Sequence, residues 1–202
     1  MTIAATPELL RWEPLTVEQV SELLKGVTVP WWIAGGWALD LFMGRQTRAH
    51  DDIEIAVYRE DLDALRRHLA GWEIFIAEAG TFTPLRADER LRAESHELWA
   101  REGGHDTWQL EILIEERRGD RWVYRRNDGI GVHWMDIGHT TADGIRYIRP
   151  EIQLLYKSKQ ARPQDESDLI TVLPRLNAAQ RGFLAAGLSL VAPDHRWLAR
   201  LK

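Results

Sequence analysis

The chain has 202 residues, of which 45% are hydrophobic and 28% are charged, and its formal net charge at pH 7 is −5. These values exclude a disordered chain and disfavour a nucleic-acid partner, and they are typical of a globular protein with one core, or a core and an appendage. The sequence has neither an apolar run long enough to span a membrane nor the basic and apolar regions of a secretory signal, so we expect a cytoplasmic protein without membrane partners.

The first predicted element is a helix. Thr16 and Gln19 have the spacing of a capping box, in which each residue's side chain accepts a hydrogen bond from the other residue's backbone N–H. Apolar residues then recur at helical intervals, so we expect a helix from about residue 17 to 25 that ends at Gly26.

A strand, a glycine turn and a helix follow. The sequence WWIA at 31–34 predicts a short buried strand, and Gly35 and Gly36 break it. Residues 37–43 are predicted to be helical up to Gly44. The glycine pair would offer backbone N–H groups and the positive end of the helix dipole to a phosphate.

Residues 52–57 alternate strictly between apolar and polar side chains, which predicts a strand with one solvent-facing side. Asp52 and Glu54 lie on that polar side. Side chains two positions apart on a strand point the same way, with Cα atoms about 6–7 Å apart, so the two carboxylates can converge on one ion or a pair of ions. Spacing alone is weak support, because an exposed acidic strand face has the same pattern.

The remaining elements complete a mixed fold. We expect a helix at 60–69, a strand at 72–77, a loop or lid at 80–94, strands at 96–101, 108–114, 121–125 and 145–148, and only helices after Pro150. The turn at 118–120 joins two of these strands. The sequence therefore predicts an α/β unit over residues 1–148 and a small helical subdomain over 149–202.

A third carboxylate interrupts another predicted strand. In WQLEILIE, alternation places Glu111 opposite the buried Leu110 and Ile112, although an edge-strand charge that prevents aggregation would look the same. The chain has no cysteine, so a metal ion would be bound by oxygen or imidazole ligands, which favours a hard cation such as Mg²⁺.

The run GGWALDLFMGRQTRAHDDIEIAV resembles the signature of the polymerase-β-like nucleotidyltransferases, in particular the aminoglycoside 2″-adenylyltransferase and lincosamide nucleotidyltransferase group. The similarity is dense over residues 33–57 and weaker in WQLEIL, WVYRR and PEIQLLYKSKQARPQDESDL. It implies the family's α/β (α+β) nucleotidyltransferase fold, a mixed sheet flanked by helices with a small helical C-terminal part, in agreement with the elements above.

The resemblance also implies a reaction and its cofactors. A nucleoside monophosphate, AMP in the expected case of ATP, would pass to a hydroxyl of a small molecule such as an aminoglycoside or lincosamide antibiotic. Two Mg²⁺ ions, for which Mn²⁺ could substitute, would be held by Asp52 and Glu54, and Glu111 would bind an ion or accept the acceptor's proton. Gly35, Gly36 and three cations are the candidate nucleotide contacts, the cations being Arg45, Arg48 and Lys157.

The chain departs from the family pattern at two places. Many members have Gly-Ser at the turn, with the hydroxyl on a phosphate, whereas Gly36 precedes Trp37 here. The second metal carboxylate is Glu54 instead of the commoner aspartate. Two other functions therefore stay open at this point: a nucleotidyltransferase that modifies a partner protein, and a degenerate nucleotide- or metal-binding module without turnover.

Overall fold

The computed structural model describes residues 2–6 and 10–201. Its contacts divide the chain into two compact units: unit 1 comprises Met1–Ile33 and His50–Glu115, and unit 2 comprises Ala34–Ala49 and Glu116–Lys202. The contacts thus divide the chain at other places than residue 148, and the division into domains 1–148 and 149–202 stays a prediction. Among the described residues, no helix combines the length and apolarity that a membrane span requires.

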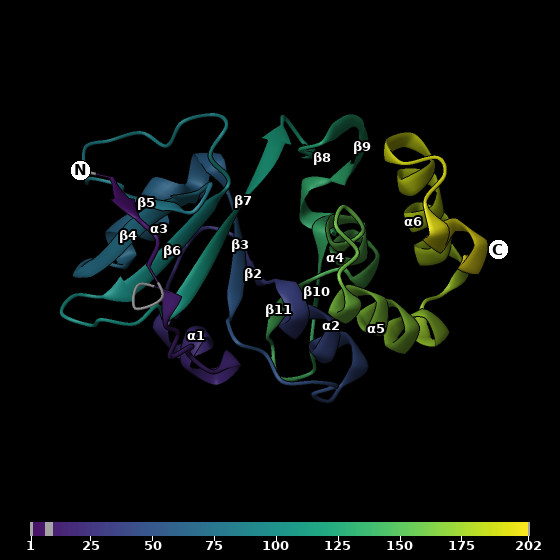
Figure 1. Ribbon diagram of the computed structural model, residues 1–202, viewed down its shortest axis with the longest axis horizontal. Helices are drawn as coiled ribbons and strands as arrows, with labels where there is room; N and C mark the ends of the chain where they lie inside the picture. The colour runs from purple at the N-terminus through teal and green to yellow at the C-terminus, as the bar shows by residue number, and fades with distance from the viewer. Residues whose placement is uncertain (1, 7–9, 202) are drawn as a thin grey trace. The chain divides into compact units, whose positions relative to one another are not determined.

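Unit 1 is built on a mixed sheet with the strand order β1-β5-β4-β6-β7-β3-β2 (Figure 1). Its strands are β1 (Ile3–Ala4), β2 (Trp31–Ile33), β3 (Glu54–Tyr58), β4 (Trp72–Glu78), β5 (Thr81–Pro84), β6 (Glu97–Glu102) and β7 (Leu110–Arg118), whose last three residues belong to unit 2. β3 and β7 run parallel, whereas the neighbouring pairs β2–β3 and β6–β7 are antiparallel. The predicted α+β fold with a mixed sheet is confirmed.

The two faces of this sheet differ in character. Ile55 and Ile112 point to one face and are completely buried, as the alternation predicted. On the opposite face, β3 itself is accessible only where it begins, because Glu54 is partly exposed while Ala56 and Tyr58, further along the same face, are buried. The solvent-facing side of this strand is therefore shorter than the sequence predicted.

Two short α-helices lie in the part of unit 1 that the structure describes. α1 (Val17–Leu23) begins with the predicted capping box: Thr16 Oγ1 accepts from the Gln19 N–H at 3.2 Å, and Gln19 Oε1 accepts from the Thr16 N–H at 2.8 Å. α3 (Leu62–His68) follows a 3-10 turn at Arg59–Asp61. The His68 imidazole lies 2.7 Å from the carbonyl oxygen of Leu23, which joins the ends of the two helices.

The predicted loop at 80–94 contains a strand. β5 pairs antiparallel with β4, and the tight turn between them passes through Ala79 (φ 47°) and Gly80 (φ 73°). Two consecutive left-handed residues match the twist of a two-residue hairpin, so the turn fixes the register of β5. β1, which the sequence did not predict, pairs with β5.

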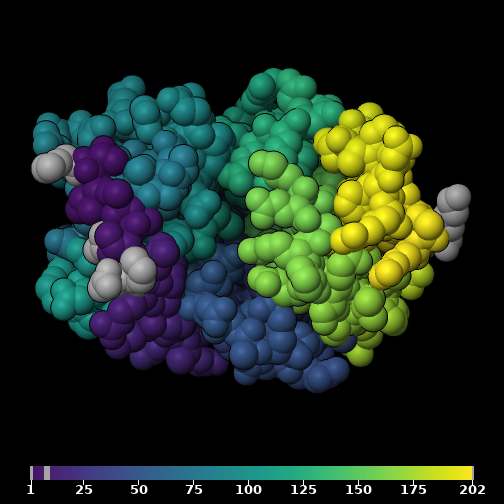
Figure 2. All heavy atoms as spheres, viewed as in Figure 1, coloured from purple at the N-terminus to yellow at the C-terminus, as the bar shows by residue number. Residues whose placement is uncertain are grey.

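Unit 2 combines helices with short strands. Its elements are α2 (Gly35–Met43), β8 (Arg121–Tyr124), β9 (Asn127–His133), β10 (Gly138–Thr140), β11 (Arg146–Ile148), α4 (Pro150–Lys157), α5 (Pro163–Val172) and α6 (Ala178–Val191), with 3-10 turns at Trp134–Ile137, Leu173–Arg175 and Arg196–Arg200. α6 packs against α4, and Figure 2 shows the yellow C-terminal segment against the green of the preceding helices. The helical C-terminal part is confirmed, whereas β9 and β10 were not predicted.

The glycine pair lies inside α2 and does not precede it, which corrects the predicted helix start. Gly35 is the first helical residue, and Gly36 follows it. The φ of Gly35 is 62°, a left-handed conformation that residues with a side chain rarely adopt. The helix ends as predicted at Gly44, whose φ of 70° is the left-handed conformation of a glycine C-cap.

A buried ion cluster holds the segment after α2 to the C-terminal helices. Arg48 donates to both carboxylate oxygens of Asp168, at 2.9 and 3.2 Å, and Lys157 Nζ lies 3.0 Å from Asp168 and 3.3 Å from Asp165. The side chains of Asp165, Asp168 and Lys157 are all at most 8% exposed. We call these four residues the Asp168 cluster. Burial alone would raise the pKa of Asp168, but the hydrogen bonds and charges of Arg48 and Lys157 lower it overall.

We expect D168N to destabilise the fold by an amount that depends on pH. The pKa of Asp168 is lower in the folded state than its ordinary value of 3.8, so the ionised carboxylate stabilises the fold at any pH above that ordinary value. This contribution is lost as the pH falls through the folded-state pKa. We expect D168N to lower the free energy of unfolding at pH 7 by roughly 2–4 kcal/mol, because the buried Lys157 and the partly buried Arg48 lose a charged partner. Urea unfolding at pH 7, 5 and 3.5 should show a difference that is constant down to pH 5 and smaller at pH 3.5.

The control is D128N. Asp128 pairs with Arg118 at 2.9 Å, but both side chains are at least 66% exposed. An exposed pair contributes about 1 kcal/mol or less, so D128N should change the unfolding free energy little. Equal effects of D128N and D168N would contradict a stabilising role for the cluster.

Candidate active site

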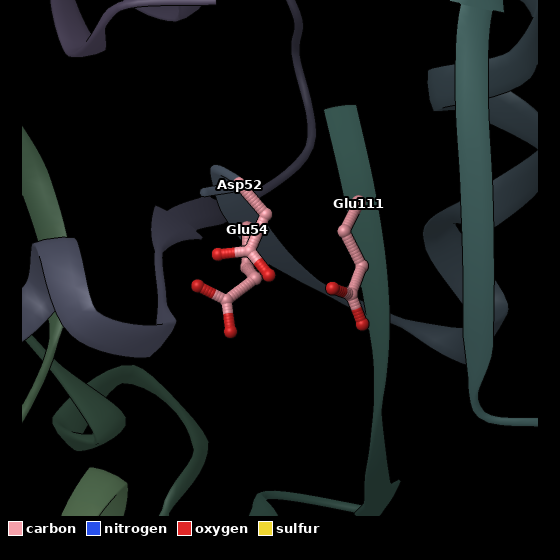
Figure 3. Close-up of side chains that lie close together, drawn as sticks. All are labelled: Asp52, Glu54 and Glu111. Carbon is pink, nitrogen blue, oxygen red and sulfur yellow. The ribbon is translucent and has the colours of Figure 1, made fainter. Parts of the chain in front are cut away.

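Three carboxylates converge in unit 1. One ligand oxygen from each of Asp52, Glu54 and Glu111 can be chosen so that all three lie within 4.8 Å of one another. Figure 3 shows that Asp52 and Glu54 come from one segment, that Glu111 comes from β7, and that the carboxylates point toward one another. The three residues that the sequence singled out as catalytic and metal-binding are thus brought together.

The pairing of two strands produces this convergence. Glu54 is the register partner of Glu111 in the parallel pair of β3 and β7, so their side chains leave the sheet on the same face. The Glu111 N–H donates to the Ile53 carbonyl oxygen at 2.9 Å, which fixes the backbone between Asp52 and Glu54. Asp52 lies two residues before β3, so the predicted strand begins later than expected, yet the i, i+2 spacing still places both carboxylates together.

The environment suits a multivalent cation. Glu111 is buried at 8% exposure, while Asp52 and Glu54 are partly exposed, so the group has one buried side and one side open to solvent. Two like unit charges 4 Å apart repel by about 4 kcal/mol at an effective dielectric constant of 20, and a bound cation removes that cost. Carboxylate oxygens are the donors that Mg²⁺ and Mn²⁺ prefer.

The predicted nucleotide contacts all lie in unit 2. The Gly35 N–H donates to Gln153 Oε1 at 3.0 Å, so in this structure a buried side chain of α4 caps the start of α2. Arg45 is exposed just beyond the other end of α2. A nine-residue helix is about 13 Å long, so Arg45 and the glycine pair are not neighbours.

Arg48 and Lys157, which were predicted to bind phosphate, both contact a carboxylate of the protein itself. Both bind Asp168 in the Asp168 cluster. Asp165, Asp168 and Gln153 were not predicted from the sequence. The signal for the first two was the i, i+3 spacing of acidic residues in DESD, which follows Lys157 at a distance that allows contact between adjacent helices. Gln153 has no such signal, because only the packing of α4 beside α2 gives it a role.

Comparison with known proteins identifies relatives by sequence. The family model of aminoglycoside-2″-adenylyltransferases matches residues 16–122. A 2″-aminoglycoside nucleotidyltransferase of Escherichia coli is 41% identical over 61 residues, which are 26% of this chain and 34% of that protein. One of Klebsiella pneumoniae is 46% identical over 46 residues, 21% of this chain and 26% of that protein. The chain thus spans about a third or less of the length of these curated relatives.

Solved structures share the fold. ANT(2″)-Ia, solved in complex with adenylyl-2″-tobramycin, superposes with a TM-score of 0.55 at 19% identity, over 87% of this chain and 97% of that one. The lincomycin-bound lincosamide antibiotic adenylyltransferase LnuA has a TM-score of 0.52 at 17% identity, over 84% of this chain and 98% of that one. At these identities the likeness is one of fold.

The matched region, residues 16–122, includes α2, β3 and the three converging carboxylates. It covers just over half of the chain. This protein therefore belongs to the aminoglycoside-2″-adenylyltransferase family.

Proposed function

We propose that this protein is a metal-dependent nucleotidyltransferase that moves AMP from ATP to a hydroxyl group of an aminoglycoside. The observation that carries the proposal is the convergence of Asp52, Glu54 and Glu111 within 4.8 Å in a chain of this family. The acceptor class follows the 2″-aminoglycoside nucleotidyltransferases to which the chain is similar over part of its length. Because that part is short, the activity of the whole protein belongs to the proposal.

The donor set fits Mg²⁺. All three side chains offer oxygen ligands, and Mg²⁺ binds proteins through one or two carboxylates while keeping several waters and substrate phosphates. Asp52 and Glu54 would hold the ion, or two ions, with the additional methylene of Glu54 giving its carboxylate more reach than an aspartate. When bound, such ions would neutralise phosphate charge and lower the pKa of the acceptor hydroxyl.

Glu111 is our candidate general base. It is the most buried of the three carboxylates and projects from β7, whereas Asp52 and Glu54 come from the segment that leads into β3. The acceptor oxygen attacks the α-phosphorus, the bond from that phosphorus to the bridging oxygen of pyrophosphate breaks, and pyrophosphate leaves. Glu111 accepts the proton that the hydroxyl loses.

The phosphate contacts in unit 2 stay a prediction, and its residues are Gly35, Gly36, Arg45, Arg48 and Lys157. The Asp168 cluster modifies this prediction for two of them. Arg48 and Lys157 already share the carboxylate of Asp168, so a triphosphate would compete with Asp168 for both cations.

We expect D52A to abolish transfer. Pyrophosphate release with ATP, Mg²⁺ and tobramycin should fall at least about 100-fold, because the variant loses a carboxylate of the metal-binding pair. D51A is the matched control, since Asp51 is an exposed neighbouring aspartate outside the three-carboxylate group. Mass spectrometry of tobramycin should show a gain of one adenylyl group with wild type and D51A only.

Two outcomes would contradict the proposal. Equal activity of D52A and wild type would refute the site. The wild type is also tested with ATP, GTP, CTP and UTP across a panel of aminoglycosides and lincosamides. If it binds Mg²⁺ and NTP clearly but releases no pyrophosphate with any acceptor, a small-molecule acceptor of these classes is refuted.

E111Q separates the two roles open to Glu111. If Glu111 accepts the proton, E111Q should lower kcat about 100-fold while Mn²⁺ affinity, measured by electron paramagnetic resonance, changes little, because the amide cannot accept a proton but preserves the shape. E54Q should weaken Mn²⁺ binding. A loss of Mn²⁺ affinity in E111Q as large as in E54Q would make Glu111 a metal ligand instead.

A further inference from the structure

Trp99 lies beside the candidate site on the same face of the sheet. On β6, Trp99 is the register partner of Glu111 on β7, while Glu54 pairs with Glu111 from the other side. Side chains of directly opposed residues leave the sheet on one face with Cβ atoms about 5 Å apart. Trp99 is partly exposed, although large aromatic side chains favour burial. An accessible ring surface therefore adjoins the carboxylate that we propose as the general base.

The ring of Trp99 is held in place by other aromatic rings. Its centroid lies 4.9 Å from Trp12, 4.9 Å from Phe82 and 5.6 Å from Trp108. Its indole Nε1 donates to Glu97 Oε1 at 3.2 Å. A side chain fixed in this way loses little conformational entropy when a ligand packs on it, which favours a binding role.

Two carboxylate side chains lie next to Trp99 on this face of the sheet. Glu97 and Glu111 both carry carboxylates on this face, and Glu97 is partly exposed. The cation on the same strand, Arg101, pairs with Glu73 at 2.8 Å and stacks over the rings of Phe75 and Trp108. Such surroundings disfavour a triphosphate and favour a positively charged ligand.

We propose that Trp99 and Glu97 bind the acceptor and select for a cationic amino sugar. The exposed surface of Trp99 packs against an ammonium-bearing ring of the acceptor by apolar and cation–π contact, and the Glu97 carboxylate binds an ammonium group. This places the acceptor on the β6 side of Glu111. The inference rests on the proposed function and adds to it the residues that choose the acceptor.

The test measures acceptor and nucleotide binding separately. Tobramycin binding is measured by isothermal titration calorimetry without nucleotide, and the KM values for tobramycin and ATP are measured by pyrophosphate release. W99L removes the aromatic ring, W99F preserves an aromatic ring of smaller size, and E97Q removes the charge while its amide oxygen can still accept from Trp99 Nε1. W72F is the matched control, because Trp72 is a partly exposed tryptophan on β4 whose position, three residues from Phe75, places it on the opposite face.

We expect W99L to weaken tobramycin binding about tenfold and to raise its KM equally, with the ATP KM unchanged. W99F should have a smaller effect, and E97Q should weaken binding most at low salt. W72F should match wild type. Thermal denaturation identifies any variant that fails to fold, in which case W99F and E97Q carry the test.

Failure of this inference can be told apart from failure of the proposed function. If wild type adenylylates tobramycin and W99L, W99F and E97Q all bind it normally, the inference is wrong and the function stands. Equal rises in the KM of tobramycin and ATP would reveal a structural role for Trp99 and also refute the inference. If wild type neither binds nor modifies tobramycin, the acceptor class is wrong and the inference falls with it.

Discussion

The parallel pairing of β3 with β7 is the constraint on which the candidate site depends. It places Glu54 opposite Glu111 and lets the Glu111 N–H bind the Ile53 carbonyl oxygen between the other two acidic positions. A shift by one residue would turn Glu111 into the buried apolar face and expose Ile112. The apolar face, with Ile55 and Ile112 completely buried, therefore selects the register that brings the carboxylates together.

The repulsion among the three carboxylates of the candidate site has to be offset by other parts of the fold. Holding three carboxylates close together lowers stability, and the apolar burial on the other face of the same strands offsets that cost. Asp52 lies outside β3, so it has no strand pairing of its own to position it. The preceding segment is well anchored in unit 2, since Thr47 donates to Asp40 from its backbone N–H at 3.1 Å and from its hydroxyl at 2.5 Å, and Arg48 binds Asp168. These contacts limit the freedom of the chain a few residues before Asp52.

Local sequence signals predicted much of the fold and the central part of the site. The capping box of α1, the glycine end of α2 and the carboxylates at Asp52, Glu54 and Glu111 follow from spacing and alternation, which depend on neighbouring residues. β9 was missed because NDGIGVH has the composition of a loop, and its pairing with β8 is a tertiary property. Long-range partners such as Gln153 for Gly35 and Asp168 for Arg48 were missed for the same reason.

The proposed function requires a metal ion at the three carboxylates. The most direct measurement is an anomalous difference map from crystals grown with Mn²⁺ and a non-hydrolysable ATP analogue. We predict a peak coordinated by the carboxylates of Asp52 and Glu54, next to Glu111 and the α-phosphate. A well-ordered nucleotide with Mn²⁺ bound elsewhere, and no peak at these residues, would contradict the central claim.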